Sequence, residues 1–340
     1  MLHLLSVFAL VSQVVTALPS TLHVRAIDAR QVGYVSVSVA TVWTDPSKPR
    51  PGVDEAALTS PDNVQGWLKS MTLDQFLDLT DNSRTQTQAL YGNEISILSE
   101  KDGWYEVAVK GQPSPKHTAG YPGWIPKAQI SLDSTYGQIQ SGSPFALVNK
   151  VAHTSLYRDA QMKKPYMEVT YATRLPVIGH HGKAAQVAVP GGGSAYVSTK
   201  HATVYKSASD IPYPTGEDLL EDGKMFIGTH YLWGGASGYA FDCSGLTHTL
   251  YDAHGITIGR DADAQADFEG HGTNVDREDL QIGDLIYYAS NLTNPSSIYH
   301  VAMYAGDGKM LEAHGAAIPT QIAPVRFDEN YWGAQRFLTK

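Results

Sequence analysis

The first clear alternation of hydrophobic and polar positions lies in residues 33–43. Val35, Val37 and Val39 alternate with small or polar residues, and Trp43 closes the run. A period of two is typical of a strand with one buried face. We therefore expect one strand here, followed by a proline-bearing loop that reaches residue 61.

Residues 63–79 change to a helical spacing, with apolar side chains at Trp67, Met71, Phe76 and Leu79. This spacing favours one or two short helices. Short strands are then expected at residues 94–99, 104–109 and 120–126, with glycine turns between them and aromatic residues near their ends. Such a succession predicts a small β-barrel, which we place over residues 33–135 with the helices as an insertion.

A second strand-rich region spans residues 143–207, with strands expected at 167–172, 185–189 and 195–197. We interpret it as a second small all-β barrel. Residues 207–215 contain two prolines and are typical of a linker. The last unit then covers residues 216–340 and begins with a helix expected over 217–227.

The only cysteine of the chain, Cys243, is predicted to lie in the first turn of a helix. Leu246 and Leu250 follow it at helical spacing, Gly255 is a natural stop, and Asp242 suits the N-cap. Free N–H groups and the helix dipole at that position are expected to lower the pKa of the thiol. The alternative is a buried, inert cysteine.

Residues 299–314 alternate as two strands around the turn Gly306-Asp307-Gly308. In a register symmetric about Asp307, His300 faces His314 with Cβ atoms roughly 5 Å apart. A one-residue bulge would shift this pairing. Two imidazoles at the open end of a hairpin can act as a general base for a thiol and as the group that orients the base.

Composition restricts the partners. The formal net charge is −9 and basic residues form no long run, which argues against nucleic acid or an anionic membrane as a partner. Residues 1–17 contain an apolar segment and the small-residue site Val15-Thr16-Ala17, so we expect a signal peptide and a secreted protein. With one cysteine, a secreted chain forms no internal disulfide. No known metal-ligand spacing occurs, so we expect neither a metal nor another cofactor, and we expect a monomer.

Five motifs in residues 216–340 carry a family resemblance. They are Tyr231-x-Trp233-Gly234-Gly235, Phe241-Asp242-Cys243-Ser244-Gly245-Leu246, Gln281-Ile282-Gly283-Asp284-Leu285, His300-Val301-Ala302-Met303-Tyr304 and Glu312-Ala313-His314-Gly315. In these motifs the chain resembles the NlpC-type cysteine peptidases, a papain-like family that cuts bacterial peptidoglycan stem peptides. The resemblance implies an α+β catalytic domain, with Cys243 as nucleophile, His300 as base and His314 as the third polar residue.

Residues 33–130 resemble bacterial SH3-like domains, through Gly120-Tyr121-Pro122-Gly123-Trp124-Ile125 among other positions. Two SH3-like barrels before such a peptidase resemble the γ-D-glutamyl-L-diamino acid endopeptidases. This resemblance implies peptidoglycan-derived peptides with a free N-terminal L-Ala as substrates. The residues that it implies in the substrate pocket are Tyr231, Trp233, Asp242, Ser244, Arg260 and Asp261, with Tyr121 closing the pocket from the first barrel.

The chemistry of that pocket can be stated as expectations. A D-Glu carboxylate needs a cation such as Arg260, and a free ammonium needs Asp242 or another carboxylate. The family usually has Gly-Glu in the first barrel, whereas this chain has Gly92-Asn93-Glu94. Either Glu94 takes that role after a shift of one residue, or the contact with the ammonium is lost.

Alternatives stay open. Arg260 and Asp261 could form an exposed ion pair, Tyr121 could only pack in its barrel, and Trp233 could only fill the core of a loop. The protein could also be a wall-binding protein without activity, or a thiol amidase or acyltransferase that acts on another amide.

Overall fold

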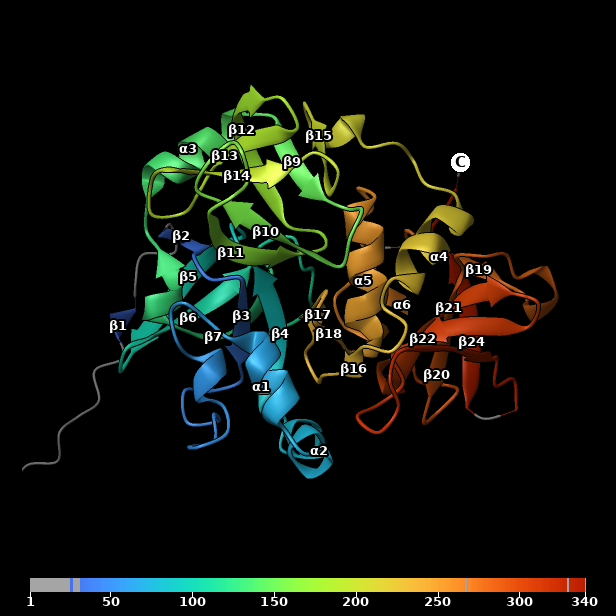
Figure 1. The fold of residues 1–340 in the computed structure, drawn as a ribbon. Helices are drawn as coiled ribbons and strands as arrows, with labels where there is room; N and C mark the ends of the chain where they lie inside the picture. Colours follow the sequence, from blue (N-terminus) through green and yellow to red (C-terminus); the bar gives the residue numbers. More distant parts are fainter. Residues whose placement is uncertain (1–24, 27–30, 267, 269, 329, 340) are drawn as a thin grey trace, which may run out of the picture.

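The computed structural model describes residues 25–26, 31–266, 268, 270–328 and 330–339. The predicted signal peptide lies outside these residues. Three units follow one another along the chain and pack together: two β-rich units and a C-terminal unit that combines helices with a sheet (Figure 1).

The first unit is one antiparallel sheet in the order β4-β3-β7-β6-β5-β2-β8, with β1 paired to β5. Its strands are β1 (Arg25–Ala26), β2 (Val32–Val35), β3 (Val39–Trp43), β4 (Thr85–Leu90), β5 (Glu94–Lys101), β6 (Trp104–Val109), β7 (Tyr121–Pro126) and β8 (Ile130–Ser131). Short 3-10 turns lie at η1 (Glu55–Ala57) and η2 (Lys127–Gln129). The strands expected after residue 93 are all present.

The single strand expected over residues 33–43 is wrong, because the chain forms two strands there. β2 pairs with β5 and β8, whereas β3 pairs with β4 and β7. Between them, the side chain of Asp62 accepts a hydrogen bond of 2.9 Å from the N–H of Ser38. Val35, Val37 and Val39 are all buried, so the hydrophobic alternation persists across the break in pairing.

The two short helices expected between strands are confirmed as α1 (Val64–Ser70) and α2 (Leu73–Asp81). Asn63 caps α1, and Thr72 forms a capping box with Gln75 at the start of α2. Trp67 and Phe76 belong to a hydrophobic core that continues into the C-terminal unit. The helices therefore join the first unit to the unit that holds Cys243.

The second unit is an antiparallel sheet in the order β11-β10-β14-β13-β12-β9-β15, entered through helix α3 (Ser134–Gly142). Its strands are β9 (Phe145–Val148), β10 (His153–Tyr157), β11 (Pro165–Thr170), β12 (Arg174–His181), β13 (Ala184–Ala188), β14 (Ser194–Ser198) and β15 (Ala202–Tyr205). In the described residues, the end strands of neither sheet pair with each other. The prediction of two small all-β barrels is therefore not confirmed in its closure, and what the structure shows is two antiparallel β-rich units.

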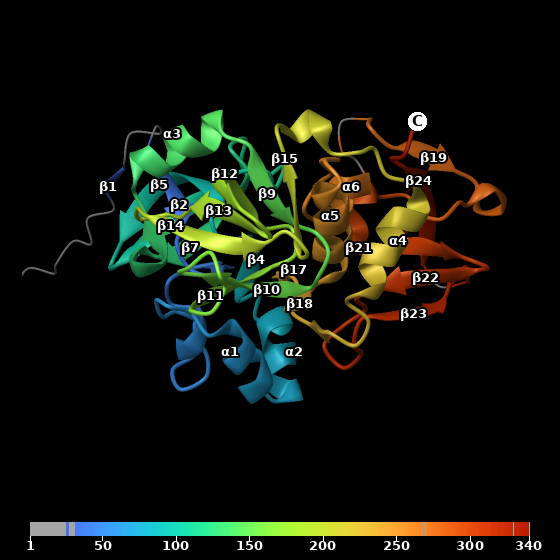
Figure 2. The same ribbon diagram turned by 45° about the horizontal axis from the view of Figure 1, so that its top comes forward.

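The C-terminal unit places three helices beside a six-stranded sheet of order β19-β24-β20-β21-β22-β23. Its elements are η3 (Ala208–Asp210), α4 (Gly216–Lys224), β16 (His230–Tyr231), β17 (Ala236–Ser237), β18 (Ala240–Phe241), α5 (Cys243–Ala253), α6 (Ala262–Ala266), β19 (Thr273–Val275), η4 (Arg277–Asp279), β20 (Leu285–Ala289), η5 (Pro295–Ser297), β21 (Ile298–Gly306), β22 (Lys309–Glu312), β23 (Gln321–Pro324) and β24 (Tyr331–Arg336). Helix α5 lies between the β-rich units and this sheet in both views (Figures 1 and 2).

Polar contacts fix the β-rich units against the C-terminal unit. The N–H of Ala236 donates to the side chain of Gln88 on β4, and the hydroxyl of Thr85 donates to the carbonyl of Trp233. On the second unit, Arg174 forms an ion pair of 2.6 Å with Asp252 at the end of α5. The segment around Cys243 is thus held from two sides.

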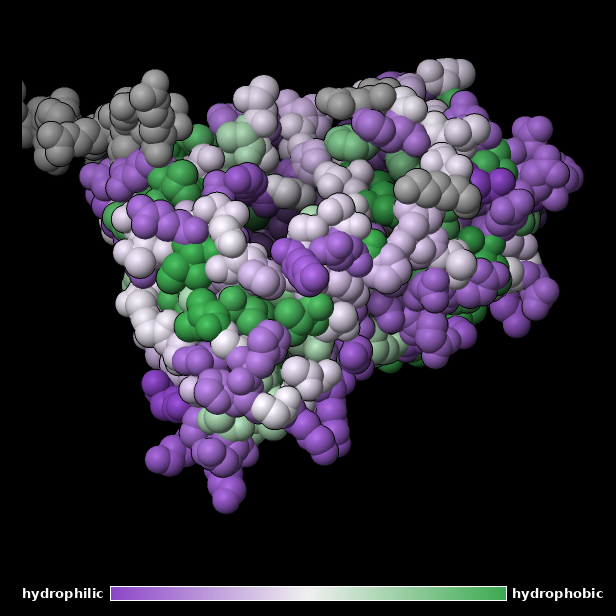
Figure 3. Space-filling view, turned by 90° about the horizontal axis from the view of Figure 1, so that it is seen from above, coloured by the Kyte–Doolittle hydropathy of each residue, from purple (hydrophilic) through white to green (hydrophobic). Residues whose placement is uncertain are grey.

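The face of the molecule that is seen from above is mostly polar (Figure 3). Figure 3 shows the face seen from above, where hydrophilic side chains predominate, hydrophobic patches are small, and a hollow lies near the centre. Among the residues that the structure describes, no helix is both long and apolar enough to span a bilayer.

Candidate active site

Cys243 is the first residue of α5, as the sequence predicts. Asp242 is the N-cap, and its carboxylate accepts a hydrogen bond of 2.6 Å from the N–H of Gly245. This bond satisfies one of the N–H groups that a helix leaves without an intrahelical partner at its start. The sequence signals for the N-cap and for the stop at Gly255 are both confirmed, the latter with a φ of 76°.

The predicted lowering of the thiol pKa is wrong. Cys243 is only 7% exposed, and burial together with the neighbouring Asp242 charge raises the pKa of its thiol to about 12. The backbone N–H groups of Val301 and Ser244 act in the opposite direction but do not outweigh burial. The solvation free energy that a thiolate loses on burial here exceeds what it gains from the hydrogen bonds and the dipole at the helix start. The resting thiol is therefore neutral and needs a base.

His300 lies on β21, next to the Val301 N–H that faces the thiol. The hairpin register is confirmed, because Met303 pairs with Leu311 and Tyr304 with Met310, symmetrically about Asp307. His300 and His314 meet edge to face with ring centroids 5.2 Å apart. The sequence therefore brings these two imidazoles together correctly.

The residue that holds His300 directly is Glu312, which the sequence reasoning did not single out. Glu312 Oε2 lies 2.9 Å from His300 Nε2 and 3.3 Å from His314 Nδ1. Burial would raise the pKa of Glu312, but His300, His314 and Arg326 together hold it well below its usual range. An ionised carboxylate only accepts hydrogen bonds, so the proton of neutral His300 resides on Nε2 and leaves Nδ1 free to accept.

Arg326 completes this cluster. Its guanidinium contacts both oxygens of Glu312, at 2.9 and 2.8 Å, and one nitrogen lies 3.4 Å from His314 Nδ1. Burial lowers the pKa of His300, and this effect exceeds the opposing influence of Glu312. The buried imidazole is therefore kept neutral, which is the form that can accept a proton from a thiol.

Arg260 and Asp242 form a second charged cluster beside the thiol. The Arg260 nitrogens lie 3.0 and 2.9 Å from the two carboxylate oxygens of Asp242. The remaining N–H groups of Arg260 donate to Ser244, to the carbonyl of Gly235 and to Thr87 of the first unit. Arg260 is 0% exposed. Burial alone would lower its pKa, but Asp242 raises it.

This geometry excludes one alternative for Arg260 and describes the surroundings of both side chains. Arg260 is not half of an exposed ion pair with Asp261, since it is buried and bound to Asp242. With its donors engaged, Arg260 has none left for a substrate carboxylate. The carboxylate of Asp242 is equally occupied, because it accepts from Arg260, Gly245 and the N–H of Gly234. Both residues help to build the loop around the nucleophile, and their substrate-binding roles stay predictions.

The chain is similar to proteins of known families. Residues 228–339 match the model of the "NlpC/P60 family", and residues 150–205 match the "YKFC SH3b2 domain". A gamma-D-glutamyl-L-lysine dipeptidyl-peptidase from Bacillus cereus is 42% identical over 308 residues, which are 90% of each chain. The chain belongs to the NlpC/P60 family.

Two further comparisons agree. A protein of the same name from Bacillus subtilis is 34% identical, over 81% of this chain and 88% of its own. A crystal structure of an NlpC/P60 family protein from Bacillus cereus is 41% identical and matches with a TM-score of 0.84, covering 91% of this chain and 100% of that one. The expected cysteine peptidase with an SH3-like domain is thus shown, and the match at residues 150–205 lies within the predicted second β-domain.

In this NlpC/P60 peptidase, Tyr121 reaches the catalytic unit from the first β-rich unit. Its hydroxyl lies 2.9 and 2.8 Å from the two oxygens of Asp261. Burial raises the pKa of Tyr121, and the Asp261 charge adds to this effect. Asp261 is partly exposed, unlike Asp242, so its carboxylate is available to an incoming ligand. The side chain of Tyr121 therefore does more than pack in its own unit.

Tyr231, Ser244 and Trp233 surround the nucleophile. Tyr231 on β16 is buried, and burial followed by the nearby Cys243 thiol raises its pKa well above the usual value. Ser244 accepts from Arg260 and donates to Asp242. Trp233 is partly buried and packs against the main core, so its position fits both a pocket wall and the loop-core alternative. The substrate-binding roles of these residues stay predictions.

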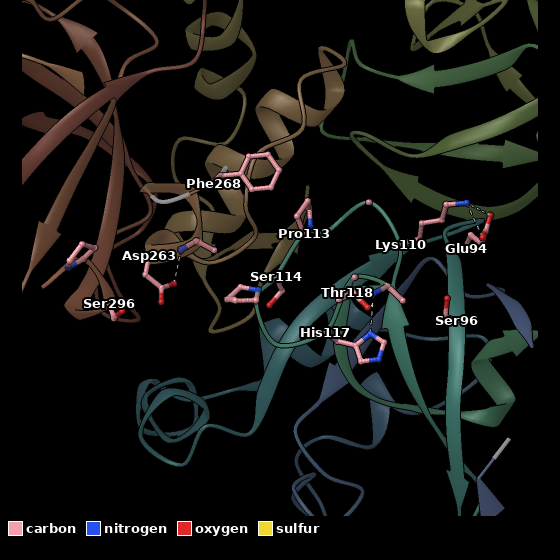
Figure 4. Close-up of a pocket in the computed structure, with 16 residues that line it drawn as sticks. Glu94, Ser96, Lys110, Pro113, Ser114, His117, Thr118, Asp263, Phe268 and Ser296 are labelled. Atoms are coloured by element: carbon pink, nitrogen blue, oxygen red, sulfur yellow. Dashed lines mark hydrogen bonds and ion pairs between the residues drawn. The ribbon is translucent and has the colours of Figure 1, made fainter. Parts of the chain in front are cut away.

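Glu94 does not join this group in the described residues. It forms an ion pair of 2.9 Å with Lys110, on the rim of a cavity of about 980 Å³ between the first unit and the catalytic unit. Figure 4 shows this pair on one side of the cavity and Asp263 and Ser296 on the other. No contact joins Glu94 to Tyr121 or Asp261 among the described residues. The predicted substitution of Glu94 for an ammonium-binding glutamate is therefore not supported by its position.

His300, Glu312 and His314 are also the kind of group that can hold a metal ion, since their ligand atoms lie within 4.8 Å of one another. Arg326, however, already binds both oxygens of Glu312 and approaches His314. A cation would have to compete with this guanidinium. The cluster fits the orientation of a base better than the binding of a metal.

Proposed function

We propose that this chain is a secreted cysteine peptidase that hydrolyses the bond between γ-D-Glu and the diamino acid in peptidoglycan stem peptides with a free N-terminal L-Ala. The family membership supports the peptidase activity, and the names of the Bacillus relatives indicate a γ-D-glutamyl bond followed by lysine. The expected signal peptide supports secretion. The observation that carries the proposed chemistry is the carboxylate of Glu312 on Nε2 of His300, beside a thiol at a helix start.

The proposed reaction begins with a neutral pair. Nδ1 of His300 takes the proton of Cys243 as the sulfur attacks the carbonyl carbon of the γ-D-glutamyl bond. Glu312 stabilises the imidazolium that forms, as a buried carboxylate does in other nucleophile–histidine sites. The imidazolium then gives its proton to the leaving amine of the diamino acid, and water releases L-Ala-γ-D-Glu from the thioester by the same base.

The oxyanion of the tetrahedral intermediate is proposed to lie at the start of α5. The N–H of Cys243 is in the first helical turn, and Tyr231 lies near enough to Cys243 for the sulfur to raise the pKa of its hydroxyl, after the larger effect of burial. Donors placed where charge develops typically contribute about 10²–10³ in rate each. Arg260 acts through Asp242 by fixing the loop that carries these groups.

The free amine is proposed to bind at Asp261. Asp242 and Glu312 are each already paired with an arginine, whereas Asp261 is partly exposed and can be reached by a ligand. Tyr121 covers the same carboxylate from the first unit. A peptide whose N-terminus binds here is proposed to place L-Ala and D-Glu between Asp261 and the thiol, in agreement with the dipeptidyl-peptidase name of the Bacillus relatives.

The test is digestion of L-Ala-γ-D-Glu-L-Lys, followed by mass spectrometry. We expect release of L-Ala-γ-D-Glu by the wild-type chain and none by Cys243→Ala. Equal release by the variant would overturn the assignment of the nucleophile, and no release by either protein would favour a wall-binding protein without activity. An N-acetylated tripeptide separates the remaining alternative, because equal cleavage of the acetylated peptide would favour a thiol amidase without need for a free amine.

A further inference from the structure

The carboxylate of Asp261 is not empty in this structure, because a lysine of the same chain occupies it. Lys116 Nζ lies 3.0 Å from Asp261 Oδ2 and 3.2 Å from the side-chain oxygen of Gln86. It also donates to the hydroxyl of Tyr121, and it lies 4.4 Å from the centroid of the Tyr121 ring. Three acceptors and an aromatic face are the surroundings that an ammonium group prefers.

Lys116 is held there by its ammonium group and not by burial. Its side chain is 45% exposed, and it belongs to the segment between β6 and β7. Pro115 and His117, on either side of it, line the 980 Å³ cavity, whereas Lys116 points toward Asp261. An exposed ion pair is weak, so a ligand of the same charge can displace Lys116 from Asp261.

The contrast with the neighbouring carboxylate makes this arrangement specific. Asp242 is bound by a fully buried arginine and by backbone N–H groups, so an incoming ligand has no access to replace these partners. Asp261 is bound by a solvent-exposed lysine and by the hydroxyl of Tyr121. Gln86, the third group around the lysine, contributes an acceptor without adding a charge.

We propose that Lys116 is a built-in competitor for the amine position: its ammonium fills the place of the substrate's N-terminal ammonium until a substrate displaces it. This proposal rests on the proposed function and deepens it, because it makes Lys116 a residue that determines specificity. A free α-ammonium replaces the charge that it displaces. An N-acylated peptide carries no such charge, so it leaves the Lys116 ammonium and the Asp261 carboxylate each without an ion-pair partner.

The expected size follows from the fraction of molecules in which the position is free. If Lys116 vacates it for about a tenth to a fifth of the time, its removal tightens apparent binding of a free amine about five- to tenfold. Lys116→Met removes the charge and keeps a flexible apolar stem. We therefore expect this variant to lower KM for L-Ala-γ-D-Glu-L-Lys by that factor, with the gain appearing in KM.

The control variants come from the same unit. Lys116→Arg keeps a cation and should retain a KM close to that of the wild type. Lys127→Met removes a lysine that pairs with Glu100 and lies over the Tyr105 ring, which reproduces the chemistry of Lys116 far from Asp261. We expect its KM to match the wild type. A KM that is unchanged or raised in Lys116→Met would overturn the proposal.

A binding measurement separates this proposal from the proposed function. Calorimetry with the product L-Ala-γ-D-Glu, on full-length Cys243→Ala with and without Lys116→Met, does not depend on hydrolysis. If the double variant binds the product more tightly but the wild type does not cleave the tripeptide, the proposed reaction is wrong and the role of Lys116 as a competitor stands. If the wild type cleaves the tripeptide and the two variants bind the product equally, only the role of Lys116 is wrong. If neither variant binds the product, both the amine site and the role of Lys116 are wrong.

Discussion

Asp242 and Asp261 lie beside the same nucleophile, yet the fold uses their carboxylates in opposite ways. Asp242 meets a buried guanidinium and two backbone N–H groups, and it has no remaining access to solvent-borne ligands. Asp261 is partly exposed and meets a tyrosine hydroxyl and an exposed lysine. Saturated, buried carboxylates position the catalytic elements, whereas an accessible carboxylate with a weakly held cation is available to bind substrate.

Glu312 belongs to the first kind. It is buried, and its oxygens meet His300, His314, Gln321 and Arg326. Because this carboxylate acts on His300 itself, it should have the largest kinetic effect of the three.

Glu312→Gln should reduce kcat/KM by about 10²–10⁴, because the amide can donate to Nε2 and favour the tautomer of His300 that cannot accept the thiol proton. Steady-state hydrolysis of the tripeptide measures this loss. His314→Gln is the comparison, since His314 is 39% exposed, packs against the His300 ring and lies farther from Glu312, at 3.3 Å. A greater loss in His314→Gln than in Glu312→Gln would restore His314 as the orienting residue.

Arg260→Met should lower the free energy of unfolding by about 3–5 kcal/mol, because Asp242 is left buried without its cation. Chemical denaturation monitored by fluorescence measures this change. Arg174→Met is the comparison, since Arg174 and Asp252 form a partly exposed pair worth about 0–1 kcal/mol. Equal losses in the two variants would remove the distinction between the buried and the accessible ion pair.

Asp261→Asn should raise KM for the free-amine tripeptide about tenfold, the equivalent of one charge-assisted hydrogen bond. Its free energy of unfolding should change little, because Asp261 and Lys116 are both partly exposed. Parallel kinetics and denaturation check both parts. A loss of stability comparable with that of Arg260→Met would place Asp261 among the structural carboxylates.

Local sequence patterns predicted those parts of the site that depend on neighbouring residues. The start of α5 follows from Asp242 and Gly255, and the hairpin register follows from the turn at Asp307. Both are fixed by short-range hydrogen bonds and by alternation. Glu312 could have been found by the same reasoning, because it ends β22 two residues before His314 and lies diagonally across from His300 in the symmetric register.

The remaining features depend on residues far apart in the chain. Arg260 is buried where two units meet. Thr87, which belongs to the first unit and precedes Arg260 by 173 positions, accepts one of its hydrogen bonds. The pKa of Cys243 rises because tertiary packing buries it, and no pattern around residue 243 reports that burial. The break between β2 and β3 likewise coincides with a hydrogen bond from Ser38 to the side chain of Asp62, 24 positions further along the chain. Such contacts require knowledge of how the three units pack.

The smallest predicted effect concerns Arg326 and the pH dependence of the reaction. Neutral His300 is the active base and burial lowers its pKa, so kcat/KM should hold to pH values below about 6.5 before protonation of His300 reduces it. The positive charge of Arg326 contributes to this lowering. Arg326→Gln should therefore move the acid limb of the profile toward higher pH, by less than about one unit. Arg336→Gln, whose partner is Asp284, should leave the limb in place. A shift toward lower pH in Arg326→Gln would mean that Arg326 acts on His300 mainly by holding Glu312 in position, and not through its charge.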